Sequence, residues 1–533
     1  MFPDNSHQET AEKIASYFNS ISQEYEPLSC SEIPMTFHRQ LPLLTCGEVA
    51  KTLRECKKSS STVPGDINSA LYAKFSEQLS VPITEIYNQV LRDKVWPLKW
   101  KTEYVTVIPK GVGSPQEPSE CRNISCTNFL SKVLERIVLN LAREEVKPRL
   151  NQFGGEPGAS TTHLLMSVLD YTIDSLEDNR SAVVLSAVDF SKAFNHLEHA
   201  ACLRTFAAKG ASTEIVQLLA AFLSGRVMTV KVEKDWSTIR PVNAGAPQGS
   251  VLGCYLFNVG VDSLEEGVCF QHDQGSSITR EHLNRTDDFP ASSTPARVGT
   301  NQQQIDISPL HNSSQNEFQV DFLPRIANIP PWLRAANEKK WKERPLLSVK
   351  FVDDGINAAA INMKEVPMMK EGNLFTKEAQ PERTQRLLEH IRLKAKELGL
   401  RVNEKKTNLI CISAAKSFQA NFKIAFGGQT VTGADRIKIL GVTVDRDCSF
   451  RTHVNNVAKK LRKKTWALGK LKKKGMSTEH LVQAYSSLIR PCAEYASPAW
   501  HPLININQSE HIERQQSQAL KNIFGVGMSA KKM

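Results

Sequence analysis

The segment LLSVKFVDDGINAAAI, residues 346–361, constrains the fold more than any other part of the chain. Two apolar runs rich in small and β-branched residues flank an Asp-Asp-Gly tip, which is typical of a tight β-hairpin. We expect Asp354-Gly355 to supply a positive-φ turn and the hairpin to present Asp353 and Asp354 at the end of a sheet. Two adjacent carboxylates repel each other unless cations lie between them. The pattern therefore predicts a divalent-metal site, and hard oxygen ligands acting on a phosphate substrate favour magnesium.

A second Asp-Asp pair in the chain shows why the surroundings of the motif matter. Asp287 and Asp288, in NRTDDFP, have no strand pattern on either side and are predicted to lie in a loop. An Asp-Asp-Gly sequence taken alone is more often a solvated turn than a metal site. The metal-site interpretation therefore depends on other motifs in the chain.

The composition excludes several classes of protein. The chain has 533 residues, 41% of them hydrophobic, which is enough for two to four domains with apolar cores. There is no run of about 18 apolar residues, so no membrane span is expected. The N-terminus lacks the basic and apolar regions of a secretory signal, and the cysteines are scattered without any C-x-x-C. We expect an intracellular protein, in the nucleus or cytoplasm, with reduced thiols and no secretion.

The positive charge of the chain is concentrated at its C-terminal end. The net charge is +11, and residues 451–533 contain 15 Lys and Arg against 4 Asp and Glu, a difference of +11. An apolar stripe at helical spacing runs along this region: Val454, Val457, Ala458, Leu461, Leu468 and Leu471. A basic helix on a neutral body predicts a nucleic-acid partner. A solvated helix face, a membrane surface and a calmodulin-like partner are the alternatives.

Hydrophobic periodicity and the positions of turn-forming residues predict the order of helices and strands. We expect strands near 102–109, 181–189 and 226–232, helices near 130–150, 212–223 and 380–398, and a strand pair within 407–445. Residues 266–344 lose all periodicity and are rich in Ser, Asn, Gln, Asp, Thr and Pro, which predicts a largely disordered insertion.

A third carboxylate stands at the end of an apolar strand. Asp189 closes SAVVLSAVD and precedes a helix, a place where catalytic groups gather in sheet-based enzymes. Its alternative role is that of a helix N-cap. Three carboxylates are what a two-metal site acting on phosphates needs.

Five motifs follow one another along the chain in this order: VDFSKAF (188–194), GAPQGSVLGCYLFN (245–258), FVDDG (351–355), VNEKKT (402–407) and ILGVTVD (439–445). They resemble the successive palm motifs of reverse transcriptases of non-LTR, LINE-type (jockey-like) retrotransposons. VWPLKWKTEYVTVIPKG, RNIS with LSKVLERIVLNLA, and NQFGGEPGASTTH resemble the fingers region of the same family, and RPCAEYASPAWHP and IERQQSQALKNIFG its tail. The resemblance spans roughly residues 45–525 apart from the insertion, and several ordered motifs are far more specific than one.

The resemblance implies an α+β fold, a right-hand polymerase of fingers, palm and thumb. Its palm is an antiparallel sheet covered by helices, and its thumb is helical and C-terminal. The implied boundaries are an N-terminal helix and linker (1–45), fingers (46–180), a first part of the palm with fingers-side helices (181–265), the insertion (266–344), a second part of the palm (345–446) and a basic helical thumb (447–533).

The resemblance also assigns roles to individual residues. Asp189, Asp353 and Asp354 are expected to bind two Mg²⁺ ions, with Mn²⁺ as an alternative, and Lys406 to protonate the pyrophosphate leaving group. The nucleotide-binding positions are Lys110, Arg122, Phe190, Phe194 (the steric gate against a 2′-hydroxyl), Gln248 and Gly249. Leu440 and Gly441 match the primer grip. The residues expected on the nucleic-acid backbone are Lys459, Lys460, Arg462, Lys463, Lys464, Lys470, Lys472, Lys473 and Lys474.

The implied activity is RNA-templated DNA synthesis, with an RNA template, a DNA primer and dNTPs as partners. No membrane partner and no obligate oligomer are indicated. The departures are Val352 in place of alanine, Asn195 in place of a second aspartate, Asn123 in place of proline, and the insertion. No endonuclease domain precedes residue 45 and no Cys/His knuckle follows the thumb, so we expect the polymerase portion of a longer element protein. The alternatives are an inactive or domesticated remnant that binds RNA or DNA, and another palm-type polymerase of the intron-encoded or telomerase-like kind.

Overall fold

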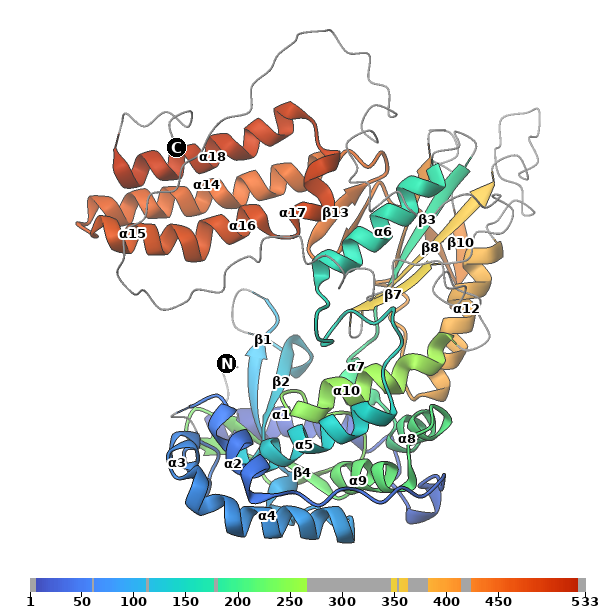
Figure 1. Ribbon diagram of the computed structural model, residues 1–533. Helices are drawn as coiled ribbons and strands as arrows, with labels where there is room; N and C mark the ends of the chain where they lie inside the picture. The colour runs from blue at the N-terminus through green and yellow to red at the C-terminus, as the bar shows by residue number, and fades with distance from the viewer. Residues whose placement is uncertain are drawn as a thin grey trace.

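A computed structural model describes residues 6–59, 62–111, 115–176, 181–265, 347–351, 354–362, 382–413 and 423–525. The fold is mixed α/β, with three parts that Figure 1 separates clearly. A large N-terminal part holds one sheet and most of the helices, a second sheet with flanking helices lies beside it, and a helical bundle forms the C-terminal part. The predicted insertion, 266–344, lies outside the described residues.

The N-terminal sheet combines segments far apart in the chain. Its strands are β1 (Thr102–Pro109), β2 (Cys121–Cys126), β4 (Arg226–Val232), β5 (Asp235–Trp236) and β6 (Arg240–Val242). The order is β2-β1-β4-β5, with β6 also paired to β4. β1 runs antiparallel to β2 but parallel to β4. The predicted strand 226–232 is therefore present, and it completes the sheet that β1 and β2 begin.

The first helix, α1 (His7–Ser22), covers this sheet. A capping box between Ser6 and Glu9 starts it. Its buried stripe, which includes Ile14 and Phe18, packs in one cluster with Val105 of β1 and Val230 of β4. The helix is thus amphipathic and belongs to the N-terminal part.

The other helices of the N-terminal part enclose a common apolar core. They are α2 (Cys46–Glu55), α3 (Ser69–Lys74), α4 (Ser76–Asp93), α5 (Phe129–Glu145), α7 (Ala193–His196), α8 (His199–Ala208), α9 (Thr213–Leu223) and α10 (Val251–Gly260). Short 3-10 segments lie at Cys30–Glu32, Leu98–Lys101, Pro118–Glu120 and Val261–Glu265. On α5 the predicted periodic positions Val133, Leu134 and Val138 are fully buried, which confirms that helix.

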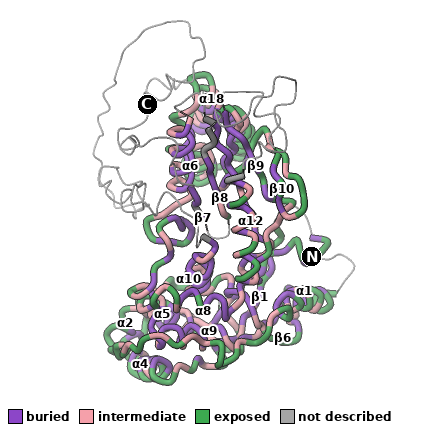
Figure 2. The backbone as a smooth tube through the Cα atoms, turned by 90° about the vertical axis from the view of Figure 1, so that its right-hand side faces the viewer, coloured by how far each residue is buried: buried purple, intermediate pink, exposed green. Residues whose placement is uncertain are grey.

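The second sheet is wholly antiparallel and has the order β7-β8-β3-β9. Its strands are β7 (Leu347–Phe351), β8 (Asp354–Asn362), β3 (Ser181–Val188) and β9 (Asn408–Ser413). β3 lies in the interior, where Val183, Val184 and Leu185 are fully buried, and Figure 2 shows buried backbone along these strands.

Alternate residues of β3 face different helices, as a strand buried on both faces requires. Val183 and Leu185 pack with α6 (Thr161–Leu176), whereas Val184 packs with α12 (Glu382–Glu397). The sheet is thus held between two helices, and the ends of its strands are fixed in space. We call it the central sheet.

The predicted hairpin at residues 346–361 is confirmed, but its predicted turn residues are wrong. Phe351 pairs with Asp354, and Gly355 pairs with Lys350 on one side and Val188 on the other. Gly355 is therefore inside strand β8 and does not have a positive φ. Asp354 and Gly355 belong to strand β8 because they pair with neighbouring strands, although the local Asp-Gly sequence favours a turn there. The residues between the strands, Val352 and Asp353, lie outside the described part of the chain.

Two further hairpins and a helical bundle complete the chain. The hairpins pair β10 (Lys423–Phe426) with β11 (Gln429–Thr432), and β12 (Arg436–Ile439) with β13 (Val442–Asp445). The bundle contains α14 (Arg451–Lys473), α15 (Thr478–Ala484), a π-helical turn (Tyr485–Ile489), α16 (Arg490–Glu494), α17 (Ser497–Trp500), a 3-10 turn (His501–Leu503) and α18 (Ile506–Phe524).

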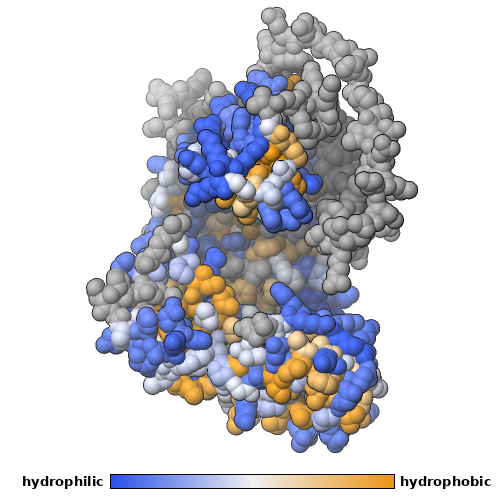
Figure 3. Space-filling model, turned by 90° about the vertical axis from the view of Figure 1, so that its left-hand side faces the viewer, coloured by the Kyte–Doolittle hydropathy of each residue, from blue (hydrophilic) through white to orange (hydrophobic). Residues whose placement is uncertain are grey.

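The apolar stripe of α14 packs inside the bundle much as the sequence predicts. Val454, Val457, Ala458, Leu461 and Leu468 are buried, whereas Leu471 near the helix end is 36% exposed. The opposite face is hydrophilic, and hydrophilic side chains cover most of the bundle where it faces the viewer in Figure 3. Among the helices of the described ranges, none combines the length and apolar character that crossing a membrane requires.

Candidate functional site

Asp189 and Asp354 lie at opposed positions on neighbouring strands. Val188, the last residue of β3, pairs with Gly355 of β8, and the two aspartates are the next residues outward. Both line a cavity of about 470 Å³ at this end of the central sheet. The side chain of Asp189 is 34% exposed. The sequence prediction that these carboxylates lie together at the end of a sheet is therefore confirmed for these two.

A loop between α12 and β9 forms a second wall of this cavity. The backbone N–H of Asn403 donates to the carbonyl of Asp189 at 2.7 Å, and the N–H of Ser191 donates to the carbonyl of Arg401 at 2.8 Å. These bonds bring Lys406 to the site, with its Nζ 3.5 Å from Asp189 Oδ2. The cavity thus combines two carboxylates with three lysines, Lys405, Lys406 and Lys438, of which the sequence analysis selected Lys406.

The turn between β12 and β13 forms a third wall. Ile439 pairs with Val442, so Leu440 and Gly441 are a two-residue loop, and both have positive φ, 44° and 91°. This is the pattern of a type I′ turn, in which glycine fits the second position without strain. Both residues line the cavity of Asp189 and Asp354.

Tyr495 fastens the Leu440-Gly441 turn to the helical bundle. Its hydroxyl donates to the carbonyl of Leu440 at 2.8 Å. Sequence reasoning did not select this tyrosine. The only available signal was its place in RPCAEYASPAWHP, a segment without clear periodicity.

The N-terminal sheet carries two of the predicted nucleotide-binding cations, Lys110 and Arg122. Lys110 follows β1, and Arg122 lies on β2 opposite Ile108; both are exposed. Partial burial lowers the pKa of Lys110, and nearby Lys406 and then Arg122 lower that pKa further, while Asp189 opposes them. The charge state of Lys110 is therefore linked to those of Lys406 and Asp189.

The loop before α10 is fastened to β2. Gly249 has φ +120°, and a Cβ there would lie 2.7 Å from the carbonyl oxygen of Ser125. The N–H of Ser125 donates to the carbonyl of Gln248 at 2.7 Å. The Gln248 side chain donates to Asn195 Oδ1 at 3.3 Å, so the loop also touches the segment that follows Asp189.

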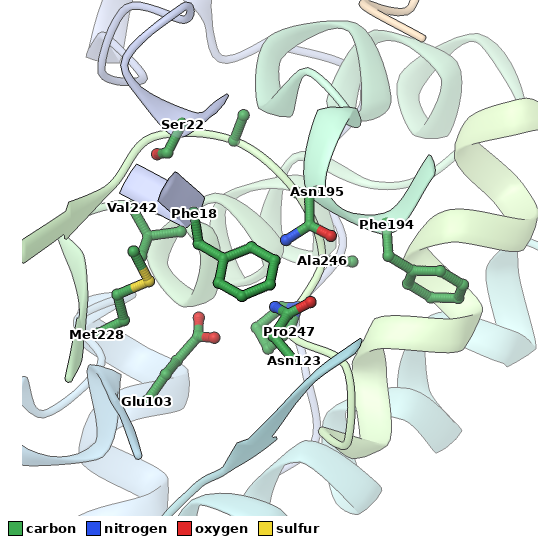
Figure 4. A pocket seen from close by; sticks show the side chains of 12 residues that line it. Phe18, Ser22, Glu103, Asn123, Phe194, Asn195, Met228, Val242, Ala246 and Pro247 are labelled. Carbon is green, nitrogen blue, oxygen red and sulfur yellow. The ribbon is translucent and has the colours of Figure 1, made fainter. Parts of the chain in front are cut away.

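Of the two phenylalanines after Asp189, Phe190 is buried in the core and Phe194 is partly buried against it. Phe190 is 7% exposed, and its backbone bridges to Val402. The ring of Phe194 stacks on Phe257 of α10 with centroids 4.6 Å apart. Figure 4 shows the Phe194 ring pointing away from the small pocket around Phe18 and toward α10. Neither ring is among those lining the Asp189 cavity.

Glu135 is a buried carboxylate that sequence reasoning missed. It has no exposed surface, accepts the N–H groups of Val251 and Leu252, and receives the hydroxyl of Ser131. It therefore caps the start of α10, directly after the Gln248-Gly249 loop. Burial raises its pKa, against the lowering effect of Arg226. The available signal was a charged residue on the apolar face of α5.

The basic residues of α14 and its end are exposed, as predicted, but they are not equivalent. Lys472 donates to the carbonyl of Ile523 and Lys464 to that of Leu488, so both are engaged within the bundle. Lys470 lies over the ring of Trp466, 5.2 Å from its centroid, and that tryptophan is 67% exposed. The exposed positions are Lys459, Lys460, Arg462, Lys463, Lys464, Lys470, Lys472, Lys473 and Lys474.

The predicted metal site can be tested on two of its three ligands. Asp189 and Asp354 offer hard oxygen donors from one cavity wall, which suits Mg²⁺ or Mn²⁺. Within the described residues, no three His, Cys, Asp or Glu side chains gather closely enough to hold a metal. Asp353, the third predicted ligand, lies outside those residues. The donor set that is described fits such an ion.

Comparison with known proteins bears on this geometry. Residues 108–278 match the family model described as reverse transcriptase (RNA-dependent DNA polymerase). The chain carries a reverse transcriptase domain. The matched range begins within β1 and includes both cations of the N-terminal sheet, Asp189 and the Gln248-Gly249 loop.

The relatives of this chain include mobile-element proteins of Drosophila melanogaster. The RNA-directed DNA polymerase from mobile element jockey is 22% identical over 540 residues, covering 96% of this chain and 49% of the relative. The probable RNA-directed DNA polymerase from transposon BS is 26% identical, covering 45% of this chain and 27% of the relative. That from transposon X-element is 29% identical, covering 39% and 23%. The chain thus spans about half or less of these relatives, and the resemblance to non-LTR retrotransposon reverse transcriptases is confirmed.

Proposed function

We propose that this chain catalyses RNA-templated DNA synthesis, adding nucleotides from dNTPs to the 3′-hydroxyl of a DNA primer. The observation that carries the proposal is the opposed placement of Asp189 and Asp354 in one cavity with Lys406. The family match and the polymerase names of the relatives support it. The chain would act as the polymerase part of a mobile-element protein.

In this proposal the three parts of the fold correspond to fingers, palm and thumb. The central sheet is the palm, the N-terminal sheet with its helices is the fingers, and the C-terminal bundle is the thumb. Lys110 and Arg122, from the fingers side, would neutralise the charge of a triphosphate, and the effect of Asp189 on the pKa of Lys110 supports this role. The exposed basic face of α14 provides charges for a nucleic-acid backbone.

Asp189 and Asp354, together with Asp353, would hold two divalent ions. Such ions, when bound, lower the pKa of the primer hydroxyl and neutralise charge on the phosphates. The side chains of the protein supply the other catalytic functions. Lys406, 3.5 Å from Asp189, is placed to donate a proton to the leaving pyrophosphate oxygen.

Positioning is the second task of the chain. Gln248 would contact the nucleotide and template, held there by its backbone bond to Ser125 and its side-chain bond to Asn195. Leu440 and Gly441 would hold the primer end over the carboxylates. Phe190 and Phe194 would lie beside the nucleotide sugar, and since the Phe194 ring stacks on Phe257, a gating role requires it to turn toward the cavity.

Primer extension on poly(rA)/oligo(dT) with Mg²⁺ tests the proposal, using the intact chain beside Asp354→Asn. We expect incorporation by the intact chain and a loss of at least about 10³-fold in the variant, since an amide is a poor ligand for a hard cation. No incorporation by the intact chain, with salt-sensitive RNA binding retained, would favour an inactive remnant. Equal incorporation by both proteins would overturn the carboxylate assignment.

The sugar gate has a separate test. Phe194→Ala should admit ribonucleotides if this ring excludes the 2′-hydroxyl. The comparison is incorporation of UTP against dTTP on the same template. Unchanged sugar selectivity would reject this role and leave Phe194 as a core residue stacked on Phe257.

A further inference from the structure

The loop between α12 and β9, residues 398–407, brings Lys406 into the Asp189 cavity. One side of this loop bonds to the backbone of Asp189 and its neighbours. The other side contacts the segment that follows α1, in which Glu24 and Tyr25 both bond to the loop. The loop is therefore held between the segment after Asp189 and the N-terminal segment of the chain.

The hydroxyl of Tyr25 joins two parts of the site that are far apart in the sequence. It donates to the carbonyl of Gly399 at 2.7 Å and lies 2.9 Å from Nδ1 of His196. Because its one hydrogen goes to the carbonyl, the hydroxyl accepts from the Nδ1–H of His196. That histidine ends α7, the short helix after Asp189, and is 4% exposed. One hydroxyl thus connects the segment after Asp189 with the beginning of the loop that carries Lys406.

Gly399 leaves the room that this contact needs. It has φ +73°, and a Cβ there would lie 2.7 Å from Cε1 of Tyr25 and 2.9 Å from the carbonyl oxygen of His196. Glycine adopts this backbone conformation without strain and adds no atom to the contact. The tyrosine ring, the end of α7 and the loop therefore meet at one point.

Tyr25 is itself anchored to the N-terminal sheet. Asn243, directly after β6, donates its backbone N–H to Ser22 Oγ at 2.5 Å and its side-chain amide to the Tyr25 carbonyl at 3.1 Å. The preceding helix, α1, is bound to the same sheet by Glu12, which pairs with Arg240 of β6 at 2.9 Å. The side chain of Tyr25 therefore extends from the N-terminal part of the fold to the loop that follows α12.

We propose that Tyr25 is a positioning residue of the polymerase, whose hydroxyl holds residues 398–407 so that Lys406 reaches the leaving pyrophosphate. The inference rests on the proposed function. The Lys406 side chain is 70% exposed, so its place depends on the backbone of its loop more than on packing around the side chain. Tyr25 does not line the cavity and acts through the loop. A restrained backbone keeps the ammonium group within reach of its target, which raises the rate of proton transfer.

Hydrogen exchange tests the positional claim without any reaction. Tyr25→Phe keeps the ring and removes both hydrogen bonds of the hydroxyl. We expect the amides of residues 398–407 to exchange about three- to tenfold faster than in the intact chain, the effect of about one lost hydrogen bond. Tyr87→Phe is the matched control, because the Tyr87 hydroxyl also donates to a carbonyl, that of Leu130 at 2.8 Å, but within the core of the N-terminal part. It should leave exchange of residues 398–407 unchanged.

Single-turnover nucleotide addition tests the functional claim. Tyr25→Phe should lower the rate about three- to tenfold and leave the affinity for a primer–template duplex unchanged. The loss should disappear in a Lys406→Gln background, because the position of the lysine matters only while the lysine is present. A merely structural loss would lower the rate by the same factor in both backgrounds. His196→Asn offers an amide N–H in place of Nδ1–H and should keep most of the rate, whereas His196→Leu should match Tyr25→Phe.

Two results would overturn this proposal. One is unchanged exchange of residues 398–407 in Tyr25→Phe, and the other is a rate loss that is the same with and without Lys406. Failure of the proposed function looks different. The intact chain would then incorporate no nucleotide, and the catalytic role of Tyr25 would fall with it, while hydrogen exchange would still report whether Tyr25 holds the loop.

Discussion

The ammonium group of Lys406 lies 3.5 Å from the carboxylate of Asp189. Both side chains are partly exposed, so this ion pair contributes little to stability. Its value is positional, because the pair places a proton donor beside a carboxylate that would hold a cation. A cation held by Asp189 would compete with Lys406 for the carboxylate and would leave the ammonium group free to reach a phosphate oxygen.

Replacing Lys406 should therefore affect rate rather than folding. In Lys406→Gln we expect the single-turnover rate of nucleotide addition to fall about 10²-fold, the usual size of a general-acid contribution. Lys406→Arg keeps the charge but releases a proton poorly, so it should bind nucleotide normally and remain slow. Rapid-quench incorporation measures both. Lys423→Gln, an exposed lysine on β10, is the control; an equal loss there would show that the effect is one of general charge.

Replacing Gly249 should disturb the Gln248 loop. A Cβ at this position meets the Ser125 carbonyl at 2.7 Å, and the φ of +120° is itself unfavourable for other residues. We expect Gly249→Ala to cost about 2–3 kcal/mol in the free energy of unfolding and to lower nucleotide affinity. Gly428→Ala is the matched control, since Gly428 also has positive φ (+77°) but open space around it. It should cost about 1 kcal/mol. Urea unfolding compares the two, and equal losses would argue against the contact with Ser125.

The buried pair of Glu103 and Arg226 should dominate the stability of the N-terminal sheet. Arg226 Nε lies 2.9 Å from Glu103 Oε1, and the two side chains are 0% and 6% exposed. Glu103 also borders the small pocket of Figure 4. Arg226→Met leaves a buried carboxylate without its cation, and we expect a loss of about 3–5 kcal/mol.

The control for that pair is an exposed one. Arg490 pairs with Glu494 on α16, with side chains 61% and 57% exposed. Arg490→Met should change stability by less than about 0.5 kcal/mol. The double variant Arg226→Met with Glu103→Leu should recover part of the loss. If the double variant is worse than the single one, the cost arises from packing rather than from the unpaired charge.

Acid should destabilise the folded chain through three buried histidines. Burial lowers the pKa of His196, His199 and His453 to about 4, from an ordinary value of 6.5. Between these values the unfolded chain binds protons that the folded chain does not. Their contribution to stability is therefore complete above about pH 6.5 and is lost as the pH falls toward 4. Urea unfolding at pH 7.5, 6 and 5 measures the slope, and His453→Phe should make it shallower. A stability that rises toward pH 5 would contradict this assignment.

The central carboxylates were predictable because their determinants are local. An apolar run that ends in Asp189 and a hairpin with Asp354 at its tip both mark the ends of strands. The ends of neighbouring strands in one sheet lie close together. The turn was mispredicted because Gly355 pairs with Val188, and that long-range pair overrides a local Asp-Gly signal. Local sequence carries no information about which strand a glycine will face.

Other features depend on contacts between distant segments. β4 joins β1 in parallel, although the chain forms β3 of the other sheet between them. The stacking of Phe194 on Phe257 joins two motifs that the sequence presents separately. In the sequence Glu135 is a charged residue on an apolar helix face. Its partner is the N–H of Val251 at the start of α10, which only the fold brings to it. Such relationships require the fold, because each residue's partner is chosen by packing.

The order of strands in the central sheet has a consequence for synthesis of the chain. β3 lies between β8 and β9, and both of these strands are translated long after it. A strand that contains Val183, Val184 and Leu185 has two bare edges until β8 is complete at Asn362, and one edge stays bare until β9 is complete at Ser413. A nascent or prematurely stopped chain would therefore expose a strongly aggregation-prone segment. Truncated products are expected to depend on chaperones or to be degraded, whereas the chain that reaches residue 413 can protect itself.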